Sequence, residues 1–331
     1  MDADAQPSRK RRPLRRLLIA VGTVIAILAV VAVGAWIWKP WAPTITVAEP
    51  ARSGEWVRAD GVLGHWYPAA DAQKGPAVLV VGGSEGGLGQ GLVSQATALQ
   101  SEGYSVLVLA YFGAEGQPDA LVDVPLETFD AGLNWLVEQP EVNPARIAMI
   151  GGSKGAEAAL LMAARSNRFA AVVAYVPSHV VWQGIDLVRP WRMSTSPQSS
   201  WTDAGKPLPY AAFGTERTDT LAETYQAALD AGVPAAARID VAAIEAPVLL
   251  TCGGRDTIWP SCRMAQELAA AGRDGQVTLL SYPDAGHLVQ GPPVDIDPER
   301  DESGGGTAKA NHEARADAWP RVVAFLREAL G

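Results

Sequence analysis

Seven short apolar runs, separated by longer segments with helical periodicity, constrain the fold of this chain more than any other feature. Several runs are almost continuously apolar, such as AVLVV, SVLVLAY and AAVVAYV. Strands of this kind are typical of parallel sheets that are covered by helices on both faces. The expected strands cover residues 62–67, 77–81, 105–111, 146–150, 169–176, 247–252 and 276–282. The expected helices cover residues 90–103, 126–139, 156–166, 261–272 and 311–330. The alternation predicts a doubly wound α/β domain with a mostly parallel sheet over residues 55–331.

Residues 178–244 interrupt this alternation. They contain no strong strand pattern and place Trp182, Trp191 and Trp201 among Pro, Ser and Thr residues. The stretch is too long for an ordinary connection between two elements. It is either an insertion that caps an active site or a surface excursion with its own small core, and the composition leaves both interpretations open.

The N-terminal segment carries the signals of a membrane anchor. A basic segment, residues 1–16, precedes an uncharged apolar run over residues 17–38, and Trp36, Trp38 and Trp41 lie at its far end. About 20 such residues suffice to span a bilayer, and the charge bias places residues 1–16 in the cytoplasm. We therefore expect a single-pass transmembrane helix over residues 17–38 that contacts the lipid bilayer, a linker over residues 39–54, and an extracytoplasmic domain over residues 55–331. The alternative is a signal peptide that is cleaved to release a secreted protein.

The charges and the cysteines limit the partners and leave one question open. Residues 40–331 carry 20 basic and 34 acidic side chains. An acidic body repels phosphates, so we expect no nucleic acid partner. The two cysteines, Cys252 and Cys262, would form a disulfide in an exported domain or remain two buried thiols.

A glycine-flanked serine supplies the first candidate catalytic residue. Ser153 lies in GGSKG, between the apolar run over residues 146–150 and an Ala-rich helical segment. This strand–turn–helix context is what a G-x-S-x-G nucleophile elbow requires. Bulk at Gly151 or Gly155 would collide with the neighbouring strand or helix, and the following helix N-terminus favours negative charge. We expect Ser153 to be a nucleophile.

A nucleophilic serine needs a base and an acid that orients the base, and the expected chain order is Ser, Asp, His. His287 follows the run over residues 276–282, and Asp256 follows the run before it. We expect Ser153, Asp256 and His287 to form a catalytic triad. Asp284 is the main rival to Asp256, and His179 is a weaker rival to His287. The two remaining histidines are expected at surface or packing positions: His65 and His312.

Backbone N–H groups are expected to bind the oxyanion that forms during acyl transfer. A glycine-rich loop, GGSEGG, follows an early strand. In this fold one donor comes from such a loop and another from the residue after the nucleophile. We therefore expect the donors to be N–H groups of Gly83, Ser84 and Lys154. A phosphate-binding loop is disfavoured because no G-K-[ST] follows, and the sequence offers no metal-ligand motif, so we expect neither cofactor nor metal.

Several sequence blocks resemble a known family. They are GGSEGGL at 82–88, AYFGAEGQPD at 110–119, VPLETF at 124–129, IGGSKGAEAAL at 150–160, PSHVVWQG at 177–184, CGGRDTIWPSC at 252–262, YPDAGH at 282–287 and GGTAKANHEARADAW at 305–319. They are similar to the C-terminal catalytic domain of the acyl-CoA thioesterase and bile acid-CoA:amino acid N-acyltransferase family, within the α/β-hydrolase superfamily. The resemblance implies a Ser–Asp–His triad that maps onto Ser153, Asp256 and His287. In this family a serine nucleophile goes with hydrolysis and a cysteine with acyl transfer.

The expected function is hydrolysis of an acyl thioester, a small-molecule substrate, through an acyl-enzyme. Trp182, Trp191 and Trp201 are candidate walls of an apolar acyl pocket or plain packing residues. Family members usually carry an N-terminal β-sandwich, for which residues 39–75 are too few, and a domain outside the membrane would meet little CoA. A carboxylesterase acting on an extracytoplasmic acyl ester is therefore the alternative, followed by a non-catalytic binding module on the same scaffold.

Overall fold

The computed structural model describes residues 11–59, 61–70, 74–214, 218–294 and 303–331. It contains two compact units, Met1–Pro43 and Thr44–Gly331. In the first unit, helix α1 spans Arg11–Trp38. Its Arg15–Trp38 portion, which contains a window of mean hydropathy 2.9, is long and apolar enough to cross a membrane. A signal sequence near an N-terminus has the same properties, so the anchor and the cleaved leader both remain predictions.

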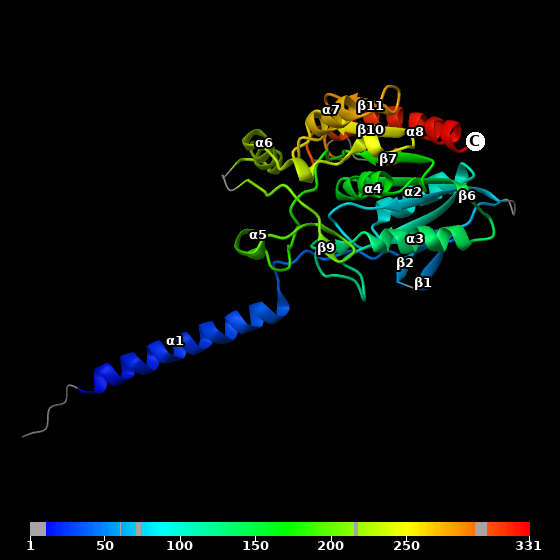
Figure 1. Cartoon of the computed structure of the whole chain (residues 1–331). Coiled ribbons are helices and arrows are strands. Elements are labelled where there is room, and N and C mark those ends of the chain that lie inside the picture. Colours follow the sequence, from blue (N-terminus) through cyan, green and yellow to red (C-terminus); the bar gives the residue numbers. More distant parts are fainter. Residues whose placement is uncertain (1–10, 60, 71–73, 215–217, 295–302) are drawn as a thin grey trace, which may run out of the picture. The chain divides into compact units, whose positions relative to one another are not determined.

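An eight-stranded sheet forms the centre of the second unit (Figure 1). Its strands are β1 (Glu55–Ala59), β2 (Val62–Tyr67), β3 (Gly75–Val81), β4 (Ser105–Ala110), β6 (Val142–Gly152), β7 (Ala171–Tyr175), β10 (Val248–Gly253) and β11 (Val277–Tyr282). Their spatial order is β1-β2-β4-β3-β6-β7-β10-β11. Strand β2 pairs antiparallel with β1 and β4, and all other neighbours are parallel. The mostly parallel sheet is confirmed, and the largely exposed edge strand β1 is the one strand of this sheet that the apolar runs do not predict.

Helices cover both faces of the sheet, so alternate residues of each strand pack into two different cores. On β3, Leu79 and Val81 belong to one core and Val78 and Val80 to the other. The helices are α2 (Gln90–Ser101), α3 (Glu127–Glu138), α4 (Lys154–Arg165), α7 (Ser261–Ala271) and α8 (Ala308–Leu330). Residues of α3, α4 and α7 contribute to the first core, and residues of α2 and α8 contribute to the second. All five helices expected from the sequence are present.

The stretch over residues 178–244 consists of short elements. They are α5 (Arg192–Thr195), β8 (Trp201–Asp203), β9 (Lys206–Pro207), α6 (Leu221–Ala231) and two 3-10 turns, Ala235–Ala237 and Val241–Ala243. Strand β8 pairs with β9 and with β5 (Val124–Pro125) in a separate three-stranded sheet. The sequence contained a missed signal for α6, because Thr220 and Glu223 form a capping box at its start.

Part of the predicted linker lies in the second unit. The Ala48 N–H donates to the Leu88 carbonyl at 2.8 Å, and the Leu88 N–H donates to the Thr46 carbonyl at 2.9 Å. A Cβ on Gly87 would lie 2.4 Å from the Thr46 oxygen, so the absence of a side chain at Gly87 lets the two backbones approach. Residues 44–54, which the sequence predicts as linker, therefore belong to the second unit.

Candidate active site

Ser153 lies on a strained turn between β6 and α4. Its φ and ψ are 55° and −117°, a conformation that L-residues adopt rarely and mainly at functional sites. The flanking glycines are required by contact. A Cβ on Gly151 would lie 2.0 Å from the Gly155 oxygen, and one on Gly155 would lie 2.2 Å from the Gly82 oxygen. The Ser153 N–H donates to the Tyr175 carbonyl at 2.9 Å, which ties the turn to the neighbouring strand. The strand–turn–helix geometry expected from the sequence is thus present.

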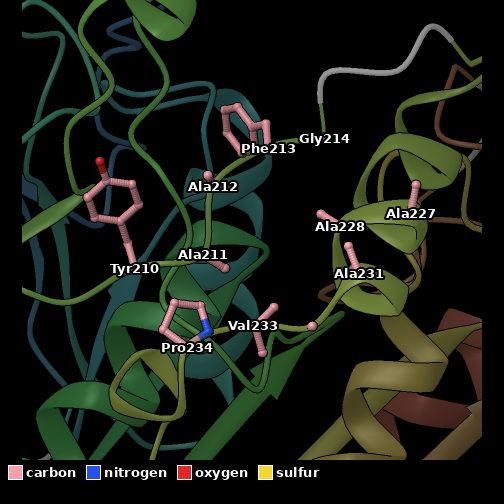
Figure 2. A pocket seen from close by; sticks show the side chains of 11 residues that line it. Tyr210, Ala211, Ala212, Phe213, Gly214, Ala227, Ala228, Ala231, Val233 and Pro234 are labelled. Carbon is pink, nitrogen blue, oxygen red and sulfur yellow. The ribbon is translucent and has the colours of Figure 1, made fainter.

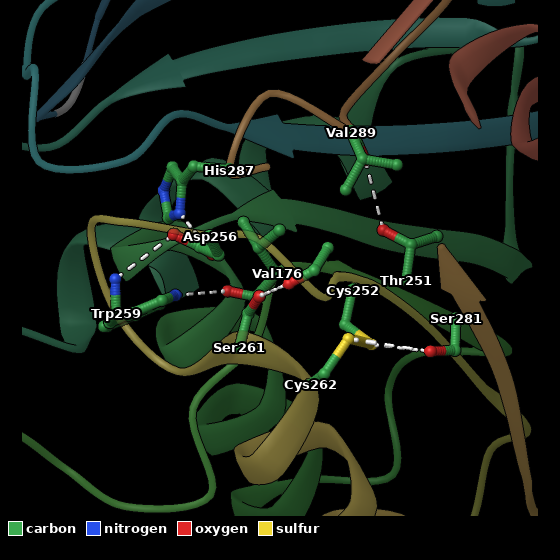
Figure 3. The surroundings of a disulfide bond; sticks show 11 residues. Val176, Thr251, Cys252, Asp256, Trp259, Ser261, Cys262, Ser281, His287 and Val289 are labelled. Atoms are coloured by element: carbon green, nitrogen blue, oxygen red, sulfur yellow. Dashed lines mark hydrogen bonds and ion pairs between the residues drawn. A yellow bond between two sulfur atoms is a disulfide. The ribbon is translucent and has the colours of Figure 1, made fainter. Parts of the chain in front are cut away.

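Asp256 and His287 are in direct contact at the carboxyl ends of neighbouring parallel strands. The distance between His287 Nδ1 and Asp256 Oδ2 is 2.8 Å (Figure 3). The other carboxylate oxygen, Oδ1, accepts the N–H groups of Ile258 and Trp259 at 2.9 and 3.2 Å. These bonds fix the carboxylate, and a proton on Nδ1 would leave Nε2 as the acceptor that a general base needs.

The rivals to these two residues lie elsewhere. Asp284 is exposed and pairs with Arg255 at 3.4 Å. His179 is buried, and burial followed by the charge of Arg238 lowers its pKa to about 4. His65 is buried between aromatic rings rather than at the surface. The structure therefore pairs Asp256, and not Asp284, with His287.

Ser153 lies at the same edge of the sheet as this pair. A Cβ on Gly152 would lie 2.0 Å from Oε1 of Gln290. The Gln290 side chain in turn donates to the His287 carbonyl at 3.1 Å. The residue before the serine thus touches the side chain that holds the histidine loop, and both Ser153 and His287 are largely buried.

The glycine-rich loop lies against the serine. A Cβ on Gly83 would lie 3.1 Å from Ser153 Cβ. The Tyr111 hydroxyl lies 2.8 Å from the Gly82 carbonyl and 3.0 Å from the Gly83 carbonyl, and the Gly83 N–H donates to Glu85 Oε1 at 2.9 Å. All peptide bonds among the described residues are trans. The Ser84 N–H therefore points away from Tyr111, whereas the Gly83 N–H already has a partner.

A buried ion pair directly follows the nucleophile, and sequence reasoning assigned no role to it. Lys154 Nζ lies 2.7 Å from Glu157 Oε2, and their side chains are 1% and 0% exposed. Burial lowers the pKa of Lys154 and raises that of Glu157, while each charge opposes the shift of the other. The spacing could have indicated this ion pair, since a Lys and a Glu three residues apart in the first turn of an Ala-rich helix lie on the same face.

The three candidate pocket tryptophans occupy different surroundings. Trp182 is fully buried and packs against Tyr225 and Phe213. Trp201 is also fully buried, but in the core that contains α3 and α4. Trp191 is 40% exposed beside α5. The first two are packing residues in separate clusters, and a role of any of the three in binding an acyl chain stays a prediction.

An apolar hollow lies between residues 210–214 and the C-terminal half of α6 (Figure 2). Its volume is about 450 Å³, and Phe213, Ala228 and Val233 are among its lining residues.

A second hollow has a volume of about 330 Å³, and Asp256 is one of its lining residues. Tyr225 and Trp259 pack edge to face, and Trp259 packs in the same way against His287. Phe213, in the wall of the first hollow, also packs edge to face against Tyr225, so this hollow borders the aromatic cluster that reaches His287.

A disulfide joins Cys252, near the end of β10, to Cys262, in the first turn of α7 (Figure 3). It closes the loop that carries Asp256 and therefore limits the movement of the predicted acid. Among the described residues, no group of three or more His, Cys, Asp or Glu side chains is arranged to hold a metal ion.

The strand order and the elbow define an α/β-hydrolase fold, and a solved structure of that fold superposes on the chain. An α/β-hydrolase from Penicillium sp. sh18 matches with a TM-score of 0.53 and 18% sequence identity over 81% of this chain and 94% of that one. The model of the family described as BAAT / Acyl-CoA thioester hydrolase C terminal matches residues 124–331. The chain belongs to this family.

Two curated relatives illustrate the similarity. Acyl-coenzyme A thioesterase 6 from Homo sapiens is 26% identical over 301 residues, which are 85% of this chain and 66% of the human protein. Acyl-coenzyme A thioesterase 6 from Mus musculus is 29% identical over 266 residues, which are 77% of this chain and 60% of the mouse protein. The chain spans slightly less than two thirds of the length of these relatives.

Proposed function

We propose that the protein is a serine hydrolase that cleaves acyl thioesters through Ser153, His287 and Asp256. The observation that carries the proposal is the 2.8 Å contact between His287 Nδ1 and Asp256 Oδ2. It occurs at the sheet edge where the strained elbow presents Ser153. The relatives named acyl-CoA thioesterases support a thioester as the substrate class.

The proposed reaction assigns one role to each of these groups. Ser153 Oγ attacks the acyl carbonyl while His287 Nε2 takes its proton, and the tetrahedral intermediate expels a thiolate that recovers this proton from the imidazolium. Water then attacks the acyl-enzyme by the same route and releases the carboxylic acid. Asp256 holds the imidazole and stabilises its protonated form. We assign the oxyanion donors to the N–H groups of Ser84 and Lys154, because the Gly83 N–H is bound to Glu85.

A carboxylesterase that acts on an extracytoplasmic acyl ester is the second candidate. The Cys252–Cys262 disulfide favours an oxidising compartment. An apolar helix that precedes the domain would anchor it in the bilayer, with residues 1–16 in the cytoplasm and the domain outside. The same triad would then act on an ester. Loss of the chain from the membrane fraction when residues 1–38 are deleted, together with an uncleaved N-terminus in the full chain, would support the anchor over the leader.

Substitution of the nucleophile tests the mechanism. Ser153→Ala should reduce turnover by roughly 10⁴-fold or more while leaving the thermal transition near that of the wild type. Ser101→Ala, at an exposed position of α2, is the matched control and should keep full activity. A fluorophosphonate probe should label the wild type and the control but not Ser153→Ala. Turnover that survives in Ser153→Ala would reject the mechanism, and a wild type that neither reacts nor turns over would instead indicate a binding module.

The acid is tested by a matched pair. Asp256→Asn should impair turnover strongly because the imidazole loses its orienting charge, whereas Asp284→Asn, at the exposed rival position, should not. A panel of acyl-CoAs and simple acyl esters of graded chain length, assayed with the full chain, then identifies the leaving group. Preference for esters at every chain length would favour the second candidate.

A further inference from the structure

The buried ion pair Lys154–Glu157 directly follows the proposed nucleophile in the chain. Both side chains are almost completely removed from solvent. Removing two charges from water costs several kcal/mol per ion, and an apolar pair of similar volume is often as stable or more stable. The role of the pair must therefore be sought in what it contacts.

Glu157 joins the elbow helix to two segments of the stretch over residues 178–244. Its Oε2 binds Lys154, while its Oε1 accepts the backbone N–H of Trp182 at 3.1 Å and the indole N–H of Trp201 at 2.7 Å. The Lys154 ammonium also lies 5.5 Å from the centre of the Trp201 ring. One side chain thus connects three parts of the chain that are distant in sequence.

Tyr111 links Trp201 to the glycine-rich loop. The Trp201 and Tyr111 rings pack with their centres 5.7 Å apart. The Tyr111 hydroxyl binds the carbonyls of Gly82 and Gly83 and so sets the direction of the Ser84 N–H. Burial, followed by the charges of Glu85 and Glu157, raises the pKa of Tyr111 well above its usual value, so this hydroxyl stays a donor.

We propose that Lys154 and Glu157 are positioning residues for the oxyanion site. Through Trp201 and Tyr111 they hold the Ser84 N–H at a fixed distance from the Lys154 N–H, so that both donors converge on one oxygen. Neither side chain touches the substrate. The proposal rests on the proposed function, because it assigns a role within that site.

The experiment separates positioning from simple stability. Glu157→Leu removes the acceptor of both tryptophan N–H groups, and Tyr111→Phe removes the hydroxyl that orients the loop without changing any charge. Tyr104→Phe, at the opposite end of β4 in the other core, is the matched control. For each variant, kcat is measured per fluorophosphonate-labelled site. KM is measured as well, together with the inhibition constant of an alkylboronic acid, which mimics the tetrahedral intermediate.

We expect kcat to fall about 10- to 100-fold in Tyr111→Phe and Glu157→Leu, below the loss for deleting a donor outright. KM should change less than about threefold, and boronate affinity should weaken by the same factor as kcat. The conservative variant Glu157→Gln, whose amide oxygen can still accept both N–H groups, should lose less kcat than Glu157→Leu. Tyr104→Phe should behave as the wild type.

Other outcomes overturn the proposal. If Tyr111→Phe keeps the kcat and boronate affinity of the wild type, the loop does not depend on this contact. A lower melting temperature with unchanged kcat per labelled site in Glu157→Leu would mean that the pair only stabilises the fold. Should Glu157→Leu fail to fold, Glu157→Gln tests the pair and Tyr111→Phe tests the loop contact, and wild-type kcat and boronate affinity in both would reject the proposal. Absence of labelling in the wild type would reject the proposed function itself, which is a distinguishable result.

Discussion

The central sheet and the stretch over residues 178–244 are built in different ways. In the sheet, strands such as β4 and β7 are buried along their whole length. Their local apolar pattern therefore suffices to define them. In the stretch, strands of two or three residues have no such pattern, and Glu157 binds the stretch through the backbone N–H of Trp182 and the indole N–H of Trp201. The sheet is thus defined by local apolar patterns, whereas the stretch combines a small apolar core around Trp182 with a few specific polar contacts between distant residues.

The largest effect is expected where the elbow meets the sheet. In Gly155→Ala the new Cβ would lie 2.2 Å from the backbone oxygen of Gly82, and neither backbone can move without distorting the sheet. We expect a loss of about 4 kcal/mol or more in the free energy of unfolding, or no soluble protein. Gly91→Ala, in α2 with no atom within 4 Å of the new Cβ, is the control and should be neutral or stabilising. Denaturant titration of both variants measures the difference.

A smaller, pH-dependent effect is expected where the stretch begins, at His179. Burial lowers its folded-state pKa to about 4, while the unfolded value is about 6.5. Between these values the unfolded chain binds the extra proton, so stability due to this group is complete above about pH 6.5 and is lost as the pH falls towards 4, by about 3 kcal/mol at most. In His179→Leu the slope of unfolding free energy against pH should flatten in this window. An unchanged slope would show that the imidazole is hydrated in the folded state.

The disulfide beside β10 provides the next test. The double variant Cys252→Ser with Cys262→Ser should lose about 2–3 kcal/mol, because the closed loop is short and the bond restricts the unfolded chain. The whole domain should unfold earlier in a single transition, since β10 belongs to the main sheet. A second, separate transition would show that β10 and α7 unfold independently of the sheet.

The smallest effect is expected in the capping box of α6. Thr220→Ala removes the side-chain acceptor of the Glu223 N–H, 3.2 Å away, and should cost about 1 kcal/mol. Hydrogen exchange should become faster in α6 while exchange in β7 stays unchanged, because the stretch opens locally. Equal acceleration in both elements would mean that the two regions unfold together and that the contrast between them does not extend to their dynamics.

Some parts of the site were accessible from the sequence. Ser153 was predictable because the strand before it and the helix after it both have strong local patterns, and the two glycines mark the turn. His287 and Asp256 were predictable because parallel strands place their carboxyl ends at one edge. The oxyanion donors were predicted only as a group. The sequence could not separate Gly83 from Ser84, because the Gly83 N–H donates to the Glu85 side chain, whose position depends on the folded loop.

The sequence by itself determined the layered α/β fold, because apolar runs and helical periodicity alternate along the chain. It also determined the candidate nucleophile, base and acid, because each of them directly follows a predicted strand. Tertiary structure decided which carboxylate contacts His287, whether the cysteines join, and how the stretch over residues 178–244 is held. It also placed the ion pair Lys154–Glu157 between the elbow, Trp182 and Trp201. Contacts between residues far apart in the chain leave no local pattern, so only the folded backbone brings them into view.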